Sequence, residues 1–170
     1  MALYLIPNGP MPTTASFASV ATGTAIKTML QVKASATKAA KIVEWGISLN
    51  GFAAALPGKV ELIQTDVGAT VTAHVTAGIM KYDADALIGG DPVTNLIQVG
   101  TTETGYTASG EGSITATRLL DAPQFIAPTT QFIKQFPLGR EPTIEIGKWG
   151  RIRVLFGTTV DCYCYMIVEV

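Results

Sequence analysis

The sequence contains little charge and no region in which basic residues collect. Charged residues make up 15% of the 170 residues, and twelve basic against thirteen acidic side chains give a net charge of −1. Nucleic-acid binding draws most of its affinity from several Lys and Arg side chains that neutralise neighbouring phosphates. Because no such cluster occurs, we do not expect nucleic acid to be a partner.

Histidine is almost absent, and this excludes most of the usual catalytic centres. His74 is the only one, so a two-histidine metal site or a multi-histidine relay within one chain is impossible. The G-x-S-x-G motif of a nucleophile elbow does not occur either. We therefore expect no catalytic residues, no cofactor and no metal, and we interpret His74 as a polar residue of an Ala- and Thr-rich segment.

The acidic and glycine-rich segments match no ligand-binding motif. Asp83, Asp85 and Asp91 share one region but lack the D-x-[DN]-x-[DN]-G order of an EF-hand loop. We expect them to be solvated carboxylates. The run from Ser109 to Ser113 lacks the Lys-Ser/Thr of a phosphate-binding loop, which predicts a simple turn.

Cysteine is scarce, with Cys162 and Cys164 as its only representatives. In a strand, residues two apart share a face with Cα atoms about 6.8 Å apart, a poor geometry for a disulfide. One interpretation is a pair of buried thiols in a reducing compartment. The other is a CxC metal or redox site, which no nearby His or Cys supports.

Long hydrophobic runs are missing as well. A membrane-spanning helix needs roughly 20 consecutive apolar residues, and Lys, Glu, Gly or Pro interrupts every apolar stretch well before that length. The opening MALYLIPNGPMP has neither the basic leader nor the apolar core of a secretory signal. We therefore expect no membrane helix and synthesis in a cytoplasm.

What the chain does contain is the pattern of many short strands. Thr, Val and Ile are frequent, while 17 Gly and 9 Pro interrupt the chain at short intervals, which is typical of strands joined by turns. Side chains alternate as burial of one face requires in residues 26–32, 41–49, 130–136, 151–156 and 160–170. About eight or nine strands predict an all-β antiparallel sandwich of jelly-roll type.

Three stretches give less definite predictions. Residues 59–67 alternate, but the two faces are similar in polarity, so the inward face is open. Residues 71–80 fit a strand as well as a short helix. Residues 83–95 have the weakest hydrophobic pattern and a Gly-Gly-Asp-Pro turn, which predicts an exposed loop.

The domain organisation predicted is one sandwich domain over residues 16–170, preceded by an N-terminal arm over residues 1–15. The apolar residues 3–6 come before a Pro/Gly-rich linker, so an anchor that reaches a neighbouring subunit is one interpretation. An edge strand of the chain's own domain is the other. Prolines around residues 130–136 favour an edge strand there too. The candidate interface residues are Leu3, Tyr4, Leu5, Ile6, Phe132 and Phe136.

Four stretches carry a resemblance that covers most of the chain: MALYLIPNGP, ATGTAIKTMLQV, VELIQTDVGATVTAHV and GYTASGEGSITATRLLDAPQF. In them the chain resembles small virion proteins of tailed bacteriophages, of the capsid decoration (cement) type. The resemblance implies a β-rich, non-enzymatic, commonly trimeric protein, made in the host cytoplasm. Such a protein would bind the outside of the major capsid protein lattice and stabilise the head.

Two other classes of function are weighed against this one. A surface poor in charge favours contact with protein, which a phage tail or receptor-binding β-sandwich module also needs. Against that alternative, aromatics make up only 8% of the chain, and heptads and collagen-like triplets are absent. A lectin-like or sugar-processing enzyme on a jelly roll would lack the necessary His and carboxylate arrangement.

Overall fold

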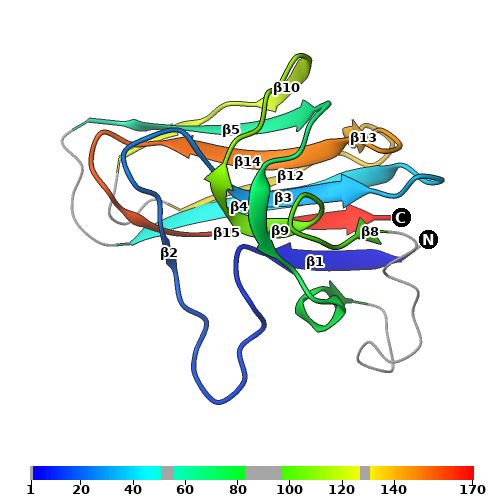
Figure 1. Cartoon of the computed structure of the whole chain (residues 1–170), viewed down its shortest axis with the longest axis horizontal. Helices are drawn as coiled ribbons and strands as arrows, with labels where there is room; N and C mark the ends of the chain where they lie inside the picture. Colours follow the sequence, from blue (N-terminus) through cyan, green and yellow to red (C-terminus); the bar gives the residue numbers. More distant parts are fainter. Residues whose placement is uncertain (1, 51–55, 83–96, 127–130) are drawn as a thin grey trace.

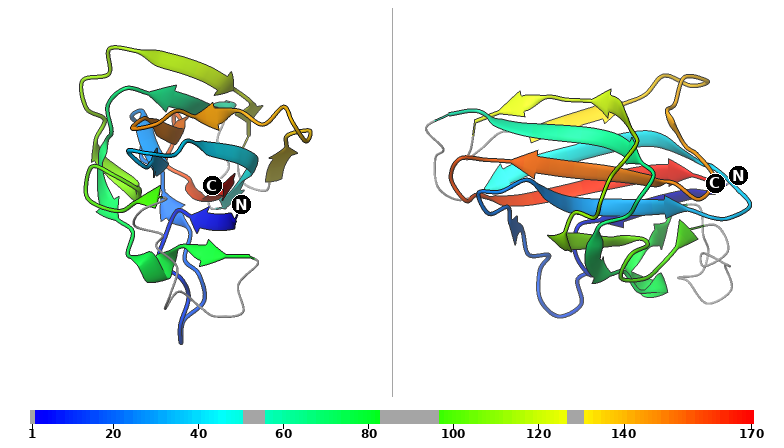
Figure 2. Two further views of the ribbon diagram at one scale, coloured as in Figure 1. Left: turned by 90° about the vertical axis from the view of Figure 1, so that its right-hand side faces the viewer. Right: turned by 45° about the horizontal axis from the view of Figure 1, so that its top comes forward.

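The structure is a computed structural model that describes residues 2–50, 56–82, 97–126 and 131–170. Within these residues, fifteen strands form two antiparallel sheets that pack face to face (Figure 1; Figure 2). The predicted all-β antiparallel sandwich is confirmed, while the jelly-roll type stays a prediction. More strands form than expected because five of them have only two residues, too few for alternation to be visible in the sequence.

The seven-stranded sheet is made of β1 (Leu3–Pro7), β2 (Val20–Ala21), β4 (Ala40–Asn50), β7 (Met80–Lys81), β12 (Gln131–Gln135), β13 (Thr143–Ile144) and β15 (Asp161–Glu169). Its strand order is β12-β4-β15-β1-β7, with β13 also beside β4 and β2 also beside β15. The central pair, β4 and β15, stays in register over all nine residues of β15 apart from one bulge. This pair provides the rigid middle of the sheet.

The eight-stranded sheet is made of β3 (Lys27–Ala34), β5 (Gly58–Thr65), β6 (Thr70–Ala73), β8 (Ile97–Gln98), β9 (Gly105–Gly110), β10 (Thr117–Asp121), β11 (Gln124–Phe125) and β14 (Trp149–Leu155). Its order is β10-β5-β14-β3-β9-β6, with β11 beside β5 and β8 beside β3. After β6 the chain forms a short 3-10 helix, η1 (Thr76–Gly78). The undecided stretch 71–80 thus contains both a strand and a helical turn.

The core fills the space between the two sheets through alternate residues of each strand. In β15 the even-numbered residues 162–168 are buried and the odd-numbered ones are partly exposed. In β5, Val60 and Leu62 face the core, which settles the face that the sequence left open. Cys162 and Cys164 are both free and buried, and burial raises the pKa of the Cys164 thiol.

The N-terminal segment corrects the predicted arm. β1 lies inside the seven-stranded sheet, paired with β15 along its whole length and with β7 at Tyr4 and Leu5. The side chains of Tyr4 and Ile6 are 0% exposed in the core of their own subunit. Residues 3–7 therefore belong to the sandwich, and Tyr4 and Ile6 are not interface residues.

A projecting loop, residues 9–19, follows β1. Asn8 continues the pairing with β15: its Nδ2 donates to the carbonyl oxygen of Cys162 at 3.2 Å, and its Oδ1 accepts from the Cys164 N–H at 3.1 Å. β2 then pairs with Asp161 and Cys162 at the start of β15. Because both ends are held by one strand, the segment between them leaves the sheet as the blue excursion below it in Figure 1.

The rings of Phe132 and Phe136 also face inward, and their assignment to an interface stays a prediction. Both are partly buried and pack against the core. The ring centroid of Phe132 lies 5.1 Å from that of Trp45 and 5.4 Å from that of Phe125. β12 is an edge strand of the described sheet, as predicted, but the large apolar residue that it exposes is Ile133.

A buried ionic clamp fixes the outer face of the eight-stranded sheet. The Arg151 side chain is 0% exposed and pairs with the Glu111 carboxylate. Its Nε and Nη2 donate to Thr28 Oγ1 at 3.0 and 2.6 Å, and Glu111 Oε1 accepts from the Thr28 N–H at 2.6 Å. Burial lowers the pKa of Arg151 to about 10, so it stays charged at neutral pH.

Candidate functional site

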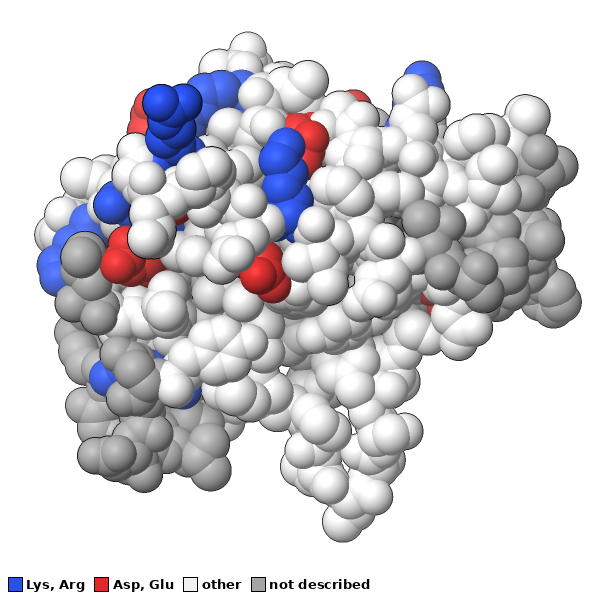
Figure 3. Space-filling view, turned by 180° about the vertical axis from the view of Figure 1, so that it is seen from behind, with Lys and Arg blue, Asp and Glu red and all other residues white. Residues whose placement is uncertain are grey.

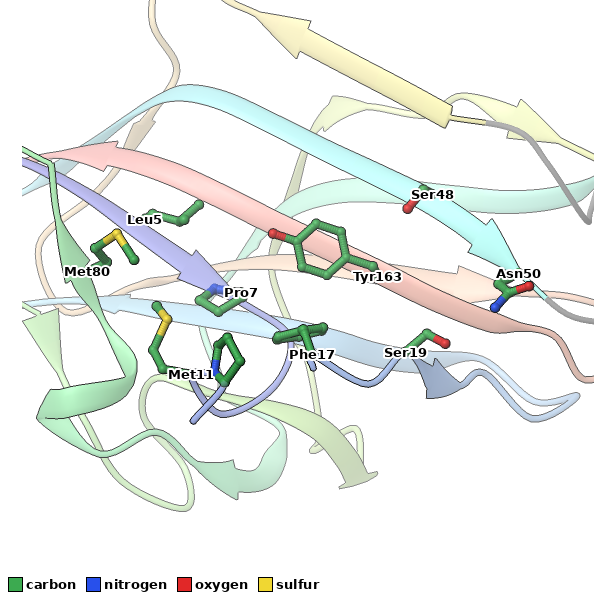
Figure 4. A pocket seen from close by; sticks show the side chains of 10 residues that line it. Leu5, Pro7, Met11, Phe17, Ser19, Ser48, Asn50, Met80 and Tyr163 are labelled. Carbon is green, nitrogen blue, oxygen red and sulfur yellow. The ribbon is translucent and has the colours of Figure 1, made fainter. Parts of the chain in front are cut away.

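A groove of about 580 Å³ lies between the outer face of the seven-stranded sheet and the projecting loop (Figure 4). Strands β1, β4, β7 and β15 supply its floor, and the loop supplies the opposite wall. None of the described residues that line it carries a charge. They are Leu5, Pro7, Met11, Pro12, Phe17, Ser19, Ser48, Asn50, Met80 and Tyr163.

Two aromatic rings hold the loop against the sheet. Phe17 of the loop meets Tyr163 of β15 edge to face, with ring centroids 4.9 Å apart and an interplanar angle of 83°, a favoured aromatic geometry. A Cβ atom at Gly9 would lie 2.8 Å from the Phe17 ring. Glycine at that position therefore allows the loop to fold back onto the sheet and form the groove.

Tyr165 continues the aromatic surface beyond the groove, with its ring centroid 5.8 Å from that of Tyr163. Its ring covers Gly46 of β4, where a Cβ atom would approach it to 2.6 Å, and its hydroxyl donates to Glu44 Oε1 at 2.6 Å. Burial raises the pKa of Tyr163 and of Tyr165. Both phenols remain protonated at neutral pH, as donors rather than nucleophiles.

The groove offers apolar surface with a few hydroxyl and amide groups at one end, where Ser19, Ser48 and Asn50 lie (Figure 4). Acid–base catalysis requires a group that gains and loses a proton near neutral pH, and the lining has none. A concave, mostly apolar surface with few polar groups is typical of a binding site. Seen from behind, the coloured charged side chains lie mostly in the upper half of the view, and the white lobe at the bottom shows none (Figure 3).

The other residues considered from the sequence lie elsewhere. Of the predicted interface residues, Leu5 lines the groove and Leu3 is partly buried. Asp83, Asp85 and Asp91 fall outside the described residues, as does the whole of the predicted loop 83–95. Across the described part of the chain, no group of three His, Cys, Asp or Glu side chains could hold a metal ion, and no helix is long and apolar enough to cross a membrane.

His74 is a structural contact between β6 and the end of β1. Its side chain is buried, and its Nε2 lies 2.7 Å from the carbonyl oxygen of Pro7, to which the neutral ring donates. The ring packs against Tyr106 at a centroid distance of 4.9 Å. A Cβ atom at Gly78 would lie 2.8 Å from its Nδ1, so the space around it is full.

The burial of His74 predicts a loss of stability in mild acid. Desolvation lowers the folded-state pKa of His74 below the ordinary 6.5, so the unfolded chain binds the proton first. The His74 contribution to the free energy of unfolding should be constant above pH 6.5 and should fall as the pH drops below that value. Urea unfolding of the wild type and of His74→Gln between pH 5 and pH 8 measures it. An identical pH dependence in both proteins would contradict the prediction.

The groove itself is not predicted by the sequence. Met11 and Phe17 are far from Tyr163 along the chain, and no local pattern in the sequence connects them. No protein-family model matches the chain, and neither a curated protein nor a solved structure matches it.

Proposed function

We propose that this protein is a capsid decoration protein of a tailed bacteriophage, which binds the outside of the major capsid protein lattice and stabilises the head without catalysing a reaction. The observation that carries the proposal is the uncharged groove and the tyrosine-bearing face that continues it. The sequence resemblance supplies the phage context and the place on the virion exterior.

The residues of this surface suit contact with another protein. Tyr, Phe and Met are enriched in the buried centres of interfaces, whereas Lys, Glu and Asp are depleted there. The groove brings together Phe17, Tyr163, Met11 and Met80. A stable interface buries roughly 800 Å² on each partner, so the outer sheet face around the groove would take part as well.

Binding to phage particles that lack the protein tests the proposal. Purified protein is mixed with such particles, which carry both head and tail, and they are examined by electron microscopy. Regular added density on the outside of the shell is the expected result. Density confined to the tail tip would replace the proposal by the tail-module alternative, and absence of binding would overturn it.

A charge placed in the groove should weaken head binding. Met11→Glu introduces a carboxylate into the apolar lining, and loss of a buried contact at an interface centre costs about 2 kcal/mol or more, about thirtyfold in affinity. Thr14→Glu is the matched control, because Thr14 is exposed on the same loop and does not line the groove. Co-sedimentation with heads measures both affinities. Equal binding by the two variants would exclude the groove as the contact.

A further inference from the structure

Among the described residues, strand β12 is a free edge of the seven-stranded sheet and lacks the features that protect other edges. Unpaired N–H and C=O groups on an edge can pair with another strand, and bulges, short length or charge usually prevent this. In the part of the chain that the structure describes, β7 has only two residues, and register shifts interrupt the pairing of β6 and of β10. β12 pairs five consecutive residues with β4 without any shift.

The charge on β12 is also paired within the subunit, although the lysine that carries it stays partly exposed. Its one charged residue, Lys134, pairs with Asp121 at 3.1 Å. β10, by comparison, carries Arg118 and Asp121 in addition to its bulge. Among the described strands that end the two sheets, β12 is the one whose edge is regular and lightly charged.

The hydrogen-bonding groups of β12 point alternately toward β4 and toward the free edge. The N–H of Phe136 donates to the carbonyl oxygen of Val43 at 2.9 Å. Because bonding direction alternates along an antiparallel strand, even-numbered residues bond to β4. The odd-numbered residues Gln131, Ile133 and Gln135 therefore present their N–H and C=O groups outward.

We propose that two copies of this chain pair antiparallel through β12, about a two-fold axis at Ile133. The two seven-stranded sheets then form one continuous sheet. Ile133 lies opposite Ile133 of the second copy, and Gln131 lies opposite Gln135. The outward-pointing groups of three residues on each strand would form about six backbone hydrogen bonds.

The side chains favour this register over its neighbours. Phe132 lies opposite Lys134 of the second copy, a cation–aromatic pair, and no two like charges are opposed. An axis at Lys134 would place two lysines opposite each other, which is unfavourable. An axis at Gln131 or Gln135 would leave most of β12 unpaired.

The Ile133 side chain gives the pairing an apolar contribution. It is 52% exposed and stands beside Gly46, which has no side chain to cover it. Pairing brings two such isoleucines together on the outer face, near the rings of Tyr165. A two-fold contact of this kind is self-complementary, as closed dimers require. It goes beyond head binding and does not depend on it.

A charge at the axis tests the pairing. Ile133→Lys places two lysines directly opposite each other. Leu119→Lys is the matched control, since Leu119 is 62% exposed on the edge strand β10. By sedimentation equilibrium up to high micromolar concentration, we expect dimers for the wild type and Leu119→Lys, and monomers for Ile133→Lys. Circular dichroism checks that both variants are folded.

A cysteine at the axis gives a second, positive measurement. Cα atoms of a hydrogen-bonded antiparallel pair lie about 5.5 Å apart, within the range for disulfides. Ile133→Cys should cross-link two chains on mild oxidation, whereas Leu119→Cys should not; the native cysteines are buried. A monomeric wild type, a trimer unaffected by Ile133→Lys, or no selective cross-link would overturn the pairing. Head binding by Ile133→Lys is scored separately, so either proposal can fail alone.

Discussion

Replacing Glu111 by Ala is expected to lower the free energy of unfolding by about 3 to 5 kcal/mol, the usual cost of removing one partner of a buried ion pair. The variant leaves the Arg151 guanidinium, 0% exposed, without its anionic partner. Thr28 loses the carboxylate that accepts from both its N–H and its hydroxyl. Urea unfolding at neutral pH measures the change.

A second ion pair on the same sheet provides the control. Arg153 and Glu61 pair at 2.7 Å, but both side chains are partly exposed. Exposed pairs contribute about 0.2 to 1 kcal/mol, so Glu61→Ala should have a much smaller effect. Equal losses for the two variants would show that the buried Arg151–Glu111 pair stabilises the protein no more than the exposed pair does.

Truncating Ile6 to Ala should destabilise the protein by about 2 to 5 kcal/mol, the range for large-to-small changes in a core. Ile6 is 0% exposed between the two sheets. Leu5, its neighbour in the same strand, faces outward and is only partly buried. Leu5→Ala should therefore cost much less.

This comparison separates the two interpretations of the N-terminus directly. A detachable arm would give small effects at both positions, whereas a strand of the sandwich gives a large effect at Ile6 alone. Deletion of residues 2–8 would remove β1 and the Asn8 contacts to β15. Loss of binding after that deletion would therefore reflect unfolding, which makes Met11→Glu the sharper probe of the groove.

The groove depends on the contacts that hold the N-terminal segment to β15. Asn8 and β2 fix both ends of the projecting loop to β15, and Phe17 closes it against Tyr163. His74 adds a contact to Pro7 at the start of the loop. The candidate binding surface is thus held by contacts within the subunit. Because the loop is already ordered, less conformational entropy is lost when a partner binds.

Strand positions follow well from the sequence because the alternation of buried and exposed side chains is local. Residues 151–156 and 160–170 were predicted as strands, and the structure has Trp149–Leu155 and Asp161–Glu169. Prolines around residues 130–136 suit an edge strand or a strand end, and β12 is an edge strand among the described residues. Such patterns arise within a single segment that buries one of its faces, so they can be recognised without knowing which distant segments it contacts.

The predicted arm was wrong because the evidence that decides it is not local. Apolar residues before a Pro/Gly-rich segment look the same whether they anchor to a neighbour or complete their own sheet. Asn8 decides the matter by pairing with β15, 154 residues later in the chain, and no local pattern reveals such a partner. Likewise, the alternation places Phe132 and Ile133 on opposite faces of the strand, but it does not show which face points toward the core.

The amino-acid sequence by itself determined the all-β class, the approximate strands and the scarcity of groups for catalysis, because composition and two-residue periodicity act within each segment. Only the tertiary structure decided that β1 is a core strand, that Glu111 meets Arg151, that the loop and sheet enclose a groove, and that β12 stays a regular free edge. Each of these depends on segments far apart in the chain, which meet only when two sheets bury their faces together.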